Sequence, residues 1–393
     1  MVLPAIIMET VMAGREGSIA FQTGEIGGMK LKNRLVRSAT FEAMATDDGK
    51  VTNAQVELYR TLAEGGVGLI ITGHAAVHLG WSAGRHMTRI SDDSFIPLVR
   101  KIARAVHEVG NNCRVVLQLT QFGRQCGIQC LKPLVEPVAP SAVYDTLFKR
   151  TPRELTSEEI DEIIECFSQA ILRARQAEFD GVQLHAAHGY LLSSFLSPHT
   201  NRREDEYGGS TQGHAMIMKE IYERATRKVG DDFPILVKIN SDDLFPGGID
   251  ANEATRIAEE LARIGYTAIE VSGGTWEAIT RSKEELGWKP VLLPESKVGI
   301  KTKEQEAYFW EAAKRIKKKV AIPIILVGGI KSIDKIEEIL KEGSVDFCSM
   351  ARSLIREPDL PNRWLQGMGS ETAKCKSCNA CIPIDEPLKC KGN

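Results

Sequence analysis

Residues 181–187 have the sequence GVQLHAA, a short apolar run that begins at a glycine and ends in small residues. The segment before it, residues 156–179, has helical periodicity, and Thr156 followed by Glu159 has the spacing of a capping box. The same unit of a short apolar run and an amphipathic segment recurs in both directions along the chain. We count eight runs, at residues 35–40, 67–73, 115–120, 181–187, 235–240, 268–274, 324–329 and 347–351. The amphipathic segments include residues 53–64, 95–109, 156–179, 252–264, 303–319 and 333–341.

Strands that are apolar throughout and alternate with helices are typical of a parallel sheet buried on both faces. Eight units predict a closed (β/α)8 TIM barrel. An open doubly wound sheet is the competing architecture, but it would favour a Gly-rich dinucleotide turn, and no GxGxxG motif occurs here. We therefore predict one α/β barrel over residues 20–367, between an N-terminal extension (1–19) and a Cys-rich tail (368–393). The long connections at 121–152 and 189–210 are expected to lack regular structure and to be functional.

The charge balance excludes several classes of function. Lysine and arginine total 50 against 52 aspartates and glutamates, so there is no basic surplus for nucleic acid or an anionic membrane. The hydrophobic share of 43% and the charged share of 26% are ordinary for a globular protein. No apolar segment approaches the roughly 20 residues of a membrane helix, and residues 1–8, MVLPAIIM, lack the basic leader of a signal peptide. We expect a cytoplasmic homo-oligomer that acts on a small molecule.

Polar or small residues stand where the predicted strands end. In a barrel the loops that follow the strands meet at one mouth, where the active site lies. The strand-end residues are Thr40, Gly73 with His74, Gln118, His185 with His188, Lys238, Gly274, Gly328 with Gly329, and Ala351 with Arg352. A core strand would continue with apolar residues, so these residues predict a polar site at the mouth.

The last two strand ends suit an anion. Gly328 and Gly329 let the backbone approach a ligand closely, and the helix that follows is expected to present free N–H groups. Arg352 after the eighth run adds a fixed positive charge, and these two loops are the usual phosphate site of such barrels. The alternative interpretation is that the two glycines only make a tight turn.

His185 and His188 form the most specific element. Zinc sites of the HExxH type place two histidines on one face of a helix with a glutamate between, whereas here alanines separate them at a strand end. Two imidazole donors better suit an oxygen atom that gains negative charge during a reaction. Tyr190 lies two residues further on, and a phenol, protonated at neutral pH, can donate a proton. Alternatively, backbone carbonyls satisfy the histidines and Tyr190 packs as an aromatic residue.

Residues 185–192, HAAHGYLL, are followed by FLSP at 195–198, by Asn201 and Arg203, and by DEYGGS at 205–210. These motifs resemble the signature of the old yellow enzyme family. The resemblance continues through MKLKNR at 29–34, GGVGLI at 65–70, LQL at 117–119, Arg352, and PDLP at 358–361. It covers residues 20–365 in the family's order, and it implies an FMN-dependent NAD(P)H:flavin oxidoreductase with a (β/α)8 fold.

The resemblance also implies how FMN would bind at the barrel mouth. Gln118 would bond the pyrimidine edge of the flavin, and Lys238 would lie beside N1 and the C2 carbonyl, where a cation stabilises the reduced ring. Arg352 and the turn of Gly328 and Gly329 would hold the phosphate. The remaining expected flavin contacts are Ser38, Ala39, Thr40, Phe41, His74, Gly274 and Ala351.

The same resemblance implies a reaction. His185 and His188 would bind the carbonyl oxygen of an α,β-unsaturated carbonyl or thioester compound, a hydride would pass from flavin N5 to the β-carbon, and Tyr190 would protonate the α-carbon. NAD(P)H would use the same face of the flavin in an alternate half-reaction. Two other functions stay open: an amine or thioether dehydrogenase on the same flavin, and an Fe–S/FMN electron-transfer module with a protein partner.

The sequence departs from the family's usual pattern at four positions. Many members have proline where Ala39 stands, cysteine or threonine at Phe41, histidine at Gln121, and a small residue at His74. We therefore expect the surroundings of the flavin and the shape of the pocket to differ from those of typical members.

Four cysteines, Cys375, Cys378, Cys381 and Cys390, crowd the end of the chain. Their spacing resembles the first part of a ferredoxin run more than the two separated pairs of a zinc ribbon. Larger relatives of the family carry a [4Fe–4S] cluster just after the barrel, with somewhat wider spacing. Three interpretations of the tail remain: it binds an iron–sulfur cluster, it binds a zinc ion, or its thiols have no function. The other five cysteines are expected to be inert: Cys113, Cys126, Cys130, Cys166 and Cys348.

Overall fold

The computed structural model describes residue 15 and residues 17–78, 86–125, 136–383 and 386–392. The expectations about residues 1–8, Cys126 and Cys130 fall outside the described residues. Within the described part of the chain, no helix is both long and apolar enough to cross a bilayer.

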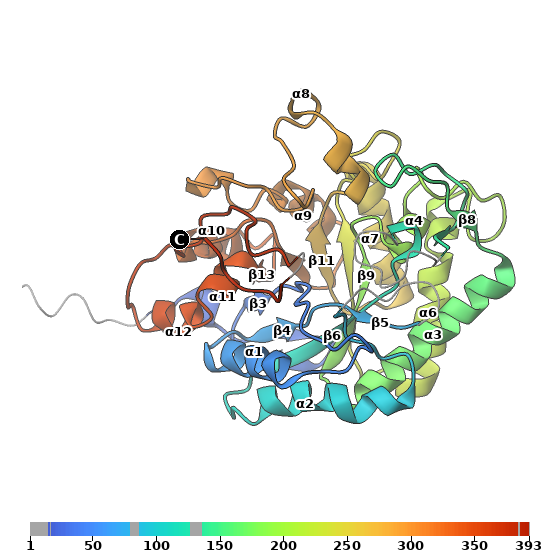
Figure 1. The fold of residues 1–393 in the computed structure, drawn as a ribbon. Helices are drawn as coiled ribbons and strands as arrows, with labels where there is room; N and C mark the ends of the chain where they lie inside the picture. The colour runs from blue at the N-terminus through green and yellow to red at the C-terminus, as the bar shows by residue number, and fades with distance from the viewer. Residues whose placement is uncertain (1–14, 16, 79–85, 126–135, 384–385, 393) are drawn as a thin grey trace, which may run out of the picture.

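Eight parallel strands form a closed barrel in the order in which they occur along the chain (Figure 1). Each strand pairs with its neighbours, and the pairing of β4 with β6 completes the ring. The closed (β/α)8 barrel predicted from the eight apolar runs is therefore confirmed. The barrel strands are β3 (Leu35–Arg37), β4 (Leu69–Ile71), β6 (Arg114–Thr120), β9 (Gly181–Ala186), β10 (Ile235–Asn240), β11 (Ile269–Ser272), β12 (Ile324–Leu326) and β13 (Phe347–Met350).

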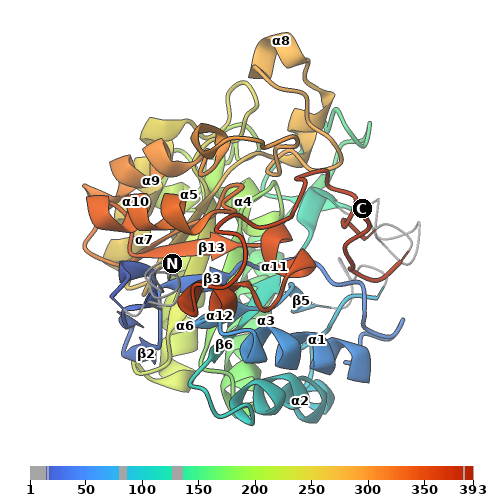
Figure 2. The ribbon, with the colours of Figure 1, turned by 90° about the vertical axis from the view of Figure 1, so that its left-hand side faces the viewer.

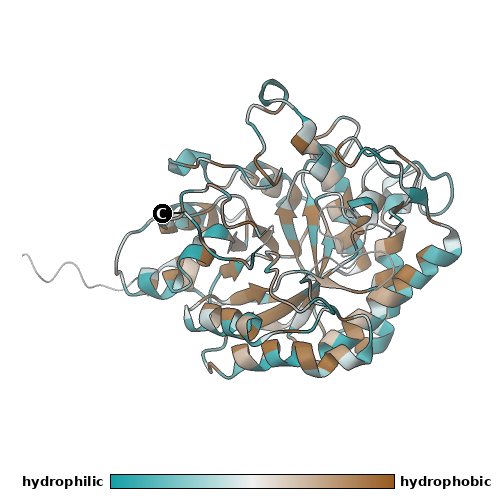
Figure 3. Ribbon diagram, viewed as in Figure 1, coloured by the Kyte–Doolittle hydropathy of each residue, from teal (hydrophilic) through white to brown (hydrophobic). Residues whose placement is uncertain are grey.

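Helices surround the barrel (Figures 1 and 2), and their buried apolar residues belong to the same core cluster as residues of the strands. The hydropathy colouring shows brown strands at the centre and teal residues on the outward faces of the helices (Figure 3). The capping box predicted at Thr156 and Glu159 is present at the start of α3, which fixes where that helix begins. The main helices are α1 (Asn53–Glu64), α2 (Ile96–His107), α3 (Ser157–Gln176), α6 (Met216–Val229), α7 (Ala251–Ile264), α9 (Trp310–Lys317) and α10 (Ile333–Glu342).

The helix predicted over residues 303–319 is shorter than expected. A 3-10 turn at Lys303–Gln305 ends before α9 begins at Trp310, and Ala307 between them has φ 55°. A left-handed residue cannot continue a right-handed helix, so the chain breaks there. The break lets the Glu306 carboxylate accept hydrogen bonds from the backbone N–H groups of Lys331 and Ser332.

An antiparallel hairpin that we did not predict closes the lower end of the barrel. Its strands are β1 (Gly24–Ile26) and β2 (Met29–Leu31). Ile26, Met29 and Leu31 pack in one buried cluster with barrel residues such as Val36 and Leu236. Because this cluster fills the barrel beneath the strand ends, the interior there is a solid core and any ligand must bind at the opposite mouth.

The two long connections do contain short elements, so the expectation that they lack regular structure is wrong. The first carries a 3-10 turn (Gly123–Gln125) and β7 (Val138–Ala139), which pairs with β8 (Arg153–Glu154) just after the connection. The second carries α4 (Leu191–Leu196). Helix α4 begins directly after Tyr190, and its six residues are all buried. The compact second connection thereby holds the predicted proton donor against the barrel rather than on a free loop.

The last helices are α11 (Arg352–Arg356) and α12 (Leu360–Leu365), and the Cys-rich tail follows them. The tail returns to the barrel mouth: the N–H of Leu388 donates to the Glu42 carbonyl (2.8 Å), and the N–H of Gly299 donates to the Ser377 carbonyl (2.9 Å). Figure 2 shows this red segment passing over the upper side of β13 and α11. The tail is therefore part of the mouth of the barrel.

Candidate active site

A pocket lies at the mouth of the barrel and encloses about 1210 Å3 of empty space, including the part open to solvent. A pocket of this size is large enough for a cofactor together with a small substrate. Almost all of the residues predicted for the site line it. They are Ser38, Ala39, Thr40, Phe41, His74, Gln118, His185, His188, Tyr190, Lys238, Gly328, Gly329, Ala351 and Arg352.

Gly274 is the exception among the residues predicted for flavin binding and catalysis, because it does not line the described pocket. It follows β11 with φ 89°, and its N–H donates to the Asp242 carbonyl at 2.7 Å. This glycine serves the turn that leads out of the strand. Ser272, at the end of β11, does line the pocket. Its Oγ lies 2.8 Å from His188 Nε2.

Lys238 and Glu270 form a buried ion pair at the floor of the pocket. They are register partners on β10 and β11, and Lys238 Nζ lies 3.4 Å from Glu270 Oε2. Burial alone would raise the pKa of Glu270, but the charge of Lys238 and three hydrogen bonds hold that pKa below its ordinary value. Ser38 and Ser349 donate two of these bonds, at 2.7 and 2.9 Å. The ion pair therefore holds the Lys238 side chain under the pocket.

Two glutamines extend the hydrogen bonding of Glu270 across the barrel interior. Gln183 Nε2 donates to Glu270 (3.0 Å), and its Oε1 accepts from Gln118 Nε2 (2.7 Å). Gln183 and Glu270 were not among the predicted site residues. Each is a polar residue inside an apolar strand run, GVQLHAA and AIEVSGG. A polar residue within an apolar strand was the sequence feature that could have identified them as site residues.

His185, His188 and Tyr190 meet on one side of the pocket. The rings of His185 and His188 are perpendicular with centroids 5.1 Å apart, and the Tyr190 ring lies 4.8 Å from His185. Burial, with the positive groups nearby, holds the pKa of both histidines well below the ordinary value, so both are neutral at pH 7. The expected cluster of two imidazoles and a phenol is thus assembled within one cavity.

The backbone around His188 adopts an uncommon conformation. His188 has φ 63° and the next residue, Gly189, has φ 82°. The N–H of His188 donates to Asn240 Oδ1 (3.0 Å), and Asn240 in turn donates to Asp243 Oδ1 (2.8 Å). Two successive left-handed residues turn the chain sharply out of β9, and this is what brings Tyr190 back toward His185.

Aromatic residues form the adjoining wall. Phe41 stacks on His74 with centroids 5.3 Å apart, and Phe122 stacks on Tyr190 at 5.2 Å. Burial and the Lys238 charge lower the pKa of His74 to about 4. Its Nε2 is buried and has no hydrogen-bond partner among the described residues, which is the condition of an atom that awaits a ligand.

Gly328, Gly329 and Arg352 lie at the far end of the pocket. Gly328 and Gly329 have φ 138° and 71°, and a Cβ on Gly329 would come 2.2 Å from Ile300 Cδ1 and 2.7 Å from Tyr308. Only glycine fits this turn, because a side chain at position 329 would collide with Ile300 and Tyr308.

Three N–H groups just before and at the start of α10 are bonded to acceptors within the protein. The Glu306 carboxylate accepts from the N–H groups of Lys331 (2.8 Å) and Ser332 (3.0 Å), and the Glu371 carbonyl accepts from Ile333 (3.0 Å). These three N–H groups are therefore not open to an anion. Positive charge at this end comes from Arg352.

The four C-terminal cysteines border one small cavity, together with Arg352, Arg356 and Asn379. Arg356 Nη1 lies 3.3 Å from Cys390 Sγ. Cys375 and Cys381 also line the main pocket. Within the described ranges, no three His, Cys, Asp or Glu side chains lie close enough to hold a single metal ion.

Three other cysteines are buried or half-buried away from this cavity: Cys113, Cys166 and Cys348. Burial raises the pKa of the Cys113 thiol to about 12 and that of Cys166 to about 11, and it raises that of Cys348 as well. A thiol that stays protonated is a poor nucleophile and metal ligand, in agreement with the expectation that these residues are inert.

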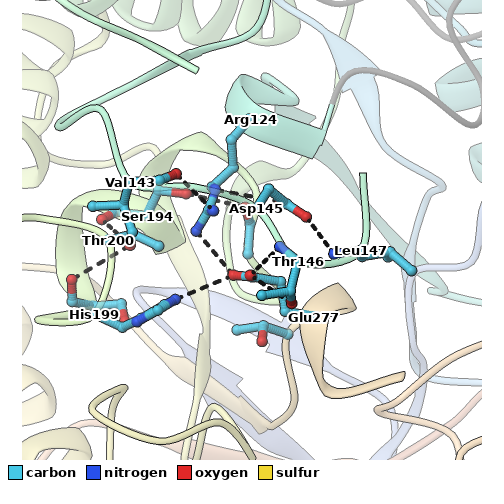
Figure 4. A network of polar contacts seen from close by, with 12 residues as sticks. Arg124, Val143, Asp145, Thr146, Leu147, Ser194, His199, Thr200 and Glu277 are labelled. Carbon is cyan, nitrogen blue, oxygen red and sulfur yellow. Dashed lines mark hydrogen bonds and ion pairs between the residues drawn. The ribbon is translucent and has the colours of Figure 1, made fainter. Parts of the chain in front are cut away.

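The second long connection and the first are joined by a buried polar network near the pocket (Figure 4). Arg124 Nη1 donates to Glu277 Oε2 (3.0 Å), and His199 Nε2 lies 3.3 Å from the same oxygen. The Arg124 guanidinium also approaches Asp145 (3.4 Å) and the Val143 carbonyl (3.1 Å). The network ties three loops that flank Tyr190.

Comparison with known proteins places the chain in a family. A model described as the NADH:flavin oxidoreductase / NADH oxidase family matches residues 20–371. An NADPH dehydrogenase of Geobacillus sp. (strain WCH70) is 32% identical over 354 residues, which cover 90% of this chain and 95% of that protein. An NADH oxidase of Thermoanaerobacter brockii is 36% identical over 370 residues, which cover 92% of this chain but 53% of that protein. The chain spans about half the length of this second relative.

The fold comparison agrees with the sequence comparison. The structure of 2-naphthoyl-CoA reductase in complex with 2-naphthoyl-CoA has a TM-score of 0.83 and 26% sequence identity, and the match covers 95% of this chain and 57% of that one. The region matched by the family model contains the whole barrel and every strand end that lines the pocket. The resemblance inferred from the sequence is thus confirmed, and the chain belongs to the NADH:flavin oxidoreductase / NADH oxidase family.

Proposed function

We propose that this protein binds FMN at the barrel mouth and uses NAD(P)H to reduce the C=C bond of α,β-unsaturated carbonyl or thioester compounds. The observation that carries the proposal is that His185, His188 and Tyr190 line the same pocket as Lys238 and Arg352. A polarising pair, a proton donor, a cation for the reduced ring and a cation for a phosphate are the parts that this reaction requires.

The pocket residues fit FMN. Lys238 is held at the floor by its ion pair with Glu270, where it would lie beside the pyrimidine edge of the ring with Gln118. The buried and unpartnered Nε2 of His74 is the feature of a site shaped for a ligand. Arg352 and the glycine turn would hold the phosphate. When bound and reduced, FMN supplies a hydride to the substrate.

His185 and His188 would hold the carbonyl oxygen of the substrate. Because both imidazoles are neutral, each has one N–H to donate and no net charge that would repel Lys238. The Ser272 hydroxyl can donate to His188 Nε2, which would leave the proton on Nδ1. Donation to the carbonyl oxygen withdraws electron density from the conjugated C=C bond.

Tyr190 would protonate the α-carbon from its hydroxyl group. Its ring is held between Phe122 and His185 and is almost fully buried, which directs the hydroxyl and excludes bulk water as the proton source. NAD(P)H would enter the same pocket, because the barrel provides one mouth for both partners.

We also propose that Cys375, Cys378, Cys381 and Cys390 bind a [4Fe–4S] cluster, which could exchange electrons with a partner protein. In support, the four thiols border one cavity, and ligation by cysteine alone is typical of such clusters. The thiols are not grouped tightly enough for a single zinc ion in this structure. Iron and acid-labile sulfide in the purified protein would support the cluster, and zinc or no metal would count against it.

The test of the main proposal separates the two half-reactions of Tyr190→Phe by anaerobic stopped-flow spectroscopy. We expect flavin reduction by NAD(P)H to keep its rate, and flavin reoxidation by an enone to slow by about 100-fold, because general acid catalysis contributes on the order of 100-fold or more. Phe245→Leu, outside the pocket lining, is the matched control and should leave both rates unchanged.

Equal loss of both half-reactions in Tyr190→Phe would contradict the role of proton donor. Reduction of the flavin by an amine, without NAD(P)H, would instead favour a dehydrogenase on the same site.

A further inference from the structure

One residue of the Cys-rich tail connects the tail to the phosphate end of the pocket. Asn379 has no exposed surface, and its backbone has φ 60°, which is left-handed. Its Nδ2 donates to the carbonyls of Val291 and Ser296, both at 2.8 Å. A buried asparagine with both donors used is held in one orientation, so the position of its Oδ1 is also determined.

The fixed Oδ1 of Asn379 accepts a hydrogen bond from Arg352 Nη1 at 2.9 Å. The same Nη1 donates to the Lys297 carbonyl at 2.8 Å. Two acceptors on one nitrogen define both the position and the plane of the guanidinium. Among the described residues, Nε and Nη2 of Arg352 have no hydrogen-bond partner, so these donors are left for a ligand in the pocket.

We propose that Asn379 is a positioning residue that holds Arg352 for the phosphate of FMN, and that the tail is therefore part of the cofactor site. This inference rests on the proposed FMN function. Arginine has five N–H donors in a rigid planar fork, so fixing one nitrogen aims the others. Without Asn379 the side chain would lose one of its two anchors and would have to be ordered when the phosphate binds.

The charges around Arg352 leave it as a suitable partner for a dianion. Lys297 lies with its ammonium 5.2 Å from the ring of Tyr308, and the Lys331 ammonium is taken by the Cys375 carbonyl at 2.7 Å. The Glu295 carboxyl also lines the pocket, and its burial raises its pKa to about 7, so at neutral pH it is partly protonated and opposes a phosphate less than an ordinary carboxylate would.

The test compares FMN with riboflavin, which has the same ring and ribityl chain but no phosphate. The full-length chain is freed of flavin, and the Kd of each flavin is measured by fluorescence titration. We expect Asn379→Ala to weaken FMN binding by about tenfold, since hydrogen bonds to charged groups are worth that much, and to leave riboflavin binding within about twofold. Unchanged riboflavin affinity also reports that the variant is folded.

A double-mutant cycle with Arg352→Lys tests whether Asn379 acts through the arginine. In the Arg352→Lys background, Asn379→Ala should cause no further loss of FMN affinity. The matched control is Asn362→Ala, because Asn362 also joins the C-terminal region to the barrel, through the Glu64 carbonyl (2.7 Å), but lies outside the pocket. It should leave both affinities unchanged.

The outcomes separate the inference from the proposed function. Equal weakening of FMN and riboflavin in Asn379→Ala, no weakening of either, or full additivity with Arg352→Lys would overturn the positioning role while the wild-type protein still prefers FMN. A wild-type protein that binds neither flavin, or binds both equally, would overturn the FMN phosphate site itself and the inference with it.

Discussion

Replacement of Arg124 by methionine tests how the loops around the pocket are held. Arg124 is the cation of a buried network in which its side chain is 1% exposed, that of Glu277 is 2% and that of Asp145 is 0%. Burial alone would raise the pKa of Glu277, but its bond with His199 and the Arg124 charge hold it below the ordinary value. Arg124→Met keeps much of the apolar stem and removes the charge.

The expected loss of unfolding free energy follows from the two buried carboxyl groups that the substitution leaves without a cation. Two carboxyl groups lose their buried cation, and breaking a buried ion pair costs about 3 to 5 kcal/mol. With a urea m-value of about 3 kcal/mol per molar, the unfolding midpoint should fall by roughly 1 to 1.7 M. The matched control is Arg153→Met, because Arg153 bonds Glu159 at 2.7 Å on the surface, where an ion pair is worth about 1 kcal/mol or less.

The assay is urea unfolding of each variant at pH 7, followed by far-ultraviolet circular dichroism. Neutralising the partners as well, in the triple variant Arg124→Met, Asp145→Asn and Glu277→Gln, should recover part of the loss, because no charge is then left buried alone. A cost below about 1 kcal/mol for Arg124→Met, or a triple variant no more stable than the single one, would refute this reasoning.

Two further predictions concern buried groups elsewhere. Burial raises the pKa of Glu42 to about 7 from 4.5, so the folded protein holds this proton more tightly than the unfolded chain, and stability falls as the pH rises from about 4.5 to 7. Glu42→Gln should therefore gain up to about 3 kcal/mol relative to wild type between pH 5 and pH 8 in urea unfolding, and a constant difference would contradict the shift. Gly329→Ala should destabilise the fold more than Gly343→Ala, since both have φ above 70° but only Gly329 lacks room for a Cβ. Equal costs would show that strain of the backbone, not the crowded turn, decides.

The barrel was predictable because its signal is local and repeated. Apolar runs such as residues 235–240 alternate with amphipathic segments, and eight such units without a Gly-rich dinucleotide turn favour a closed parallel barrel over an open sheet. Strand-end residues such as Lys238 and His185 followed from the same pattern, because register places the ends of parallel strands together. The capping box at Thr156 and Glu159 is likewise local, and it is present.

The side-chain contacts between segments far apart in the sequence were not predictable. In the sequence, Glu270 and Gln183 are isolated polar residues within apolar strands. In the barrel Glu270 pairs with Lys238, and Gln183 accepts a hydrogen bond from Gln118. The hydrogen bonds of Glu306 to the N–H groups before α10 depend on a single left-handed residue, Ala307.

The order of the amino acids was enough to specify a (β/α)8 barrel, its mouth and the cluster of His185, His188 and Tyr190, because helical and strand periodicity are properties of neighbouring residues. Only the tertiary structure decided that Asn379, 27 residues beyond Arg352, holds that arginine. Such a contact depends on the path of an irregular tail, and that path is set by packing against the assembled barrel rather than by any periodic pattern in the chain.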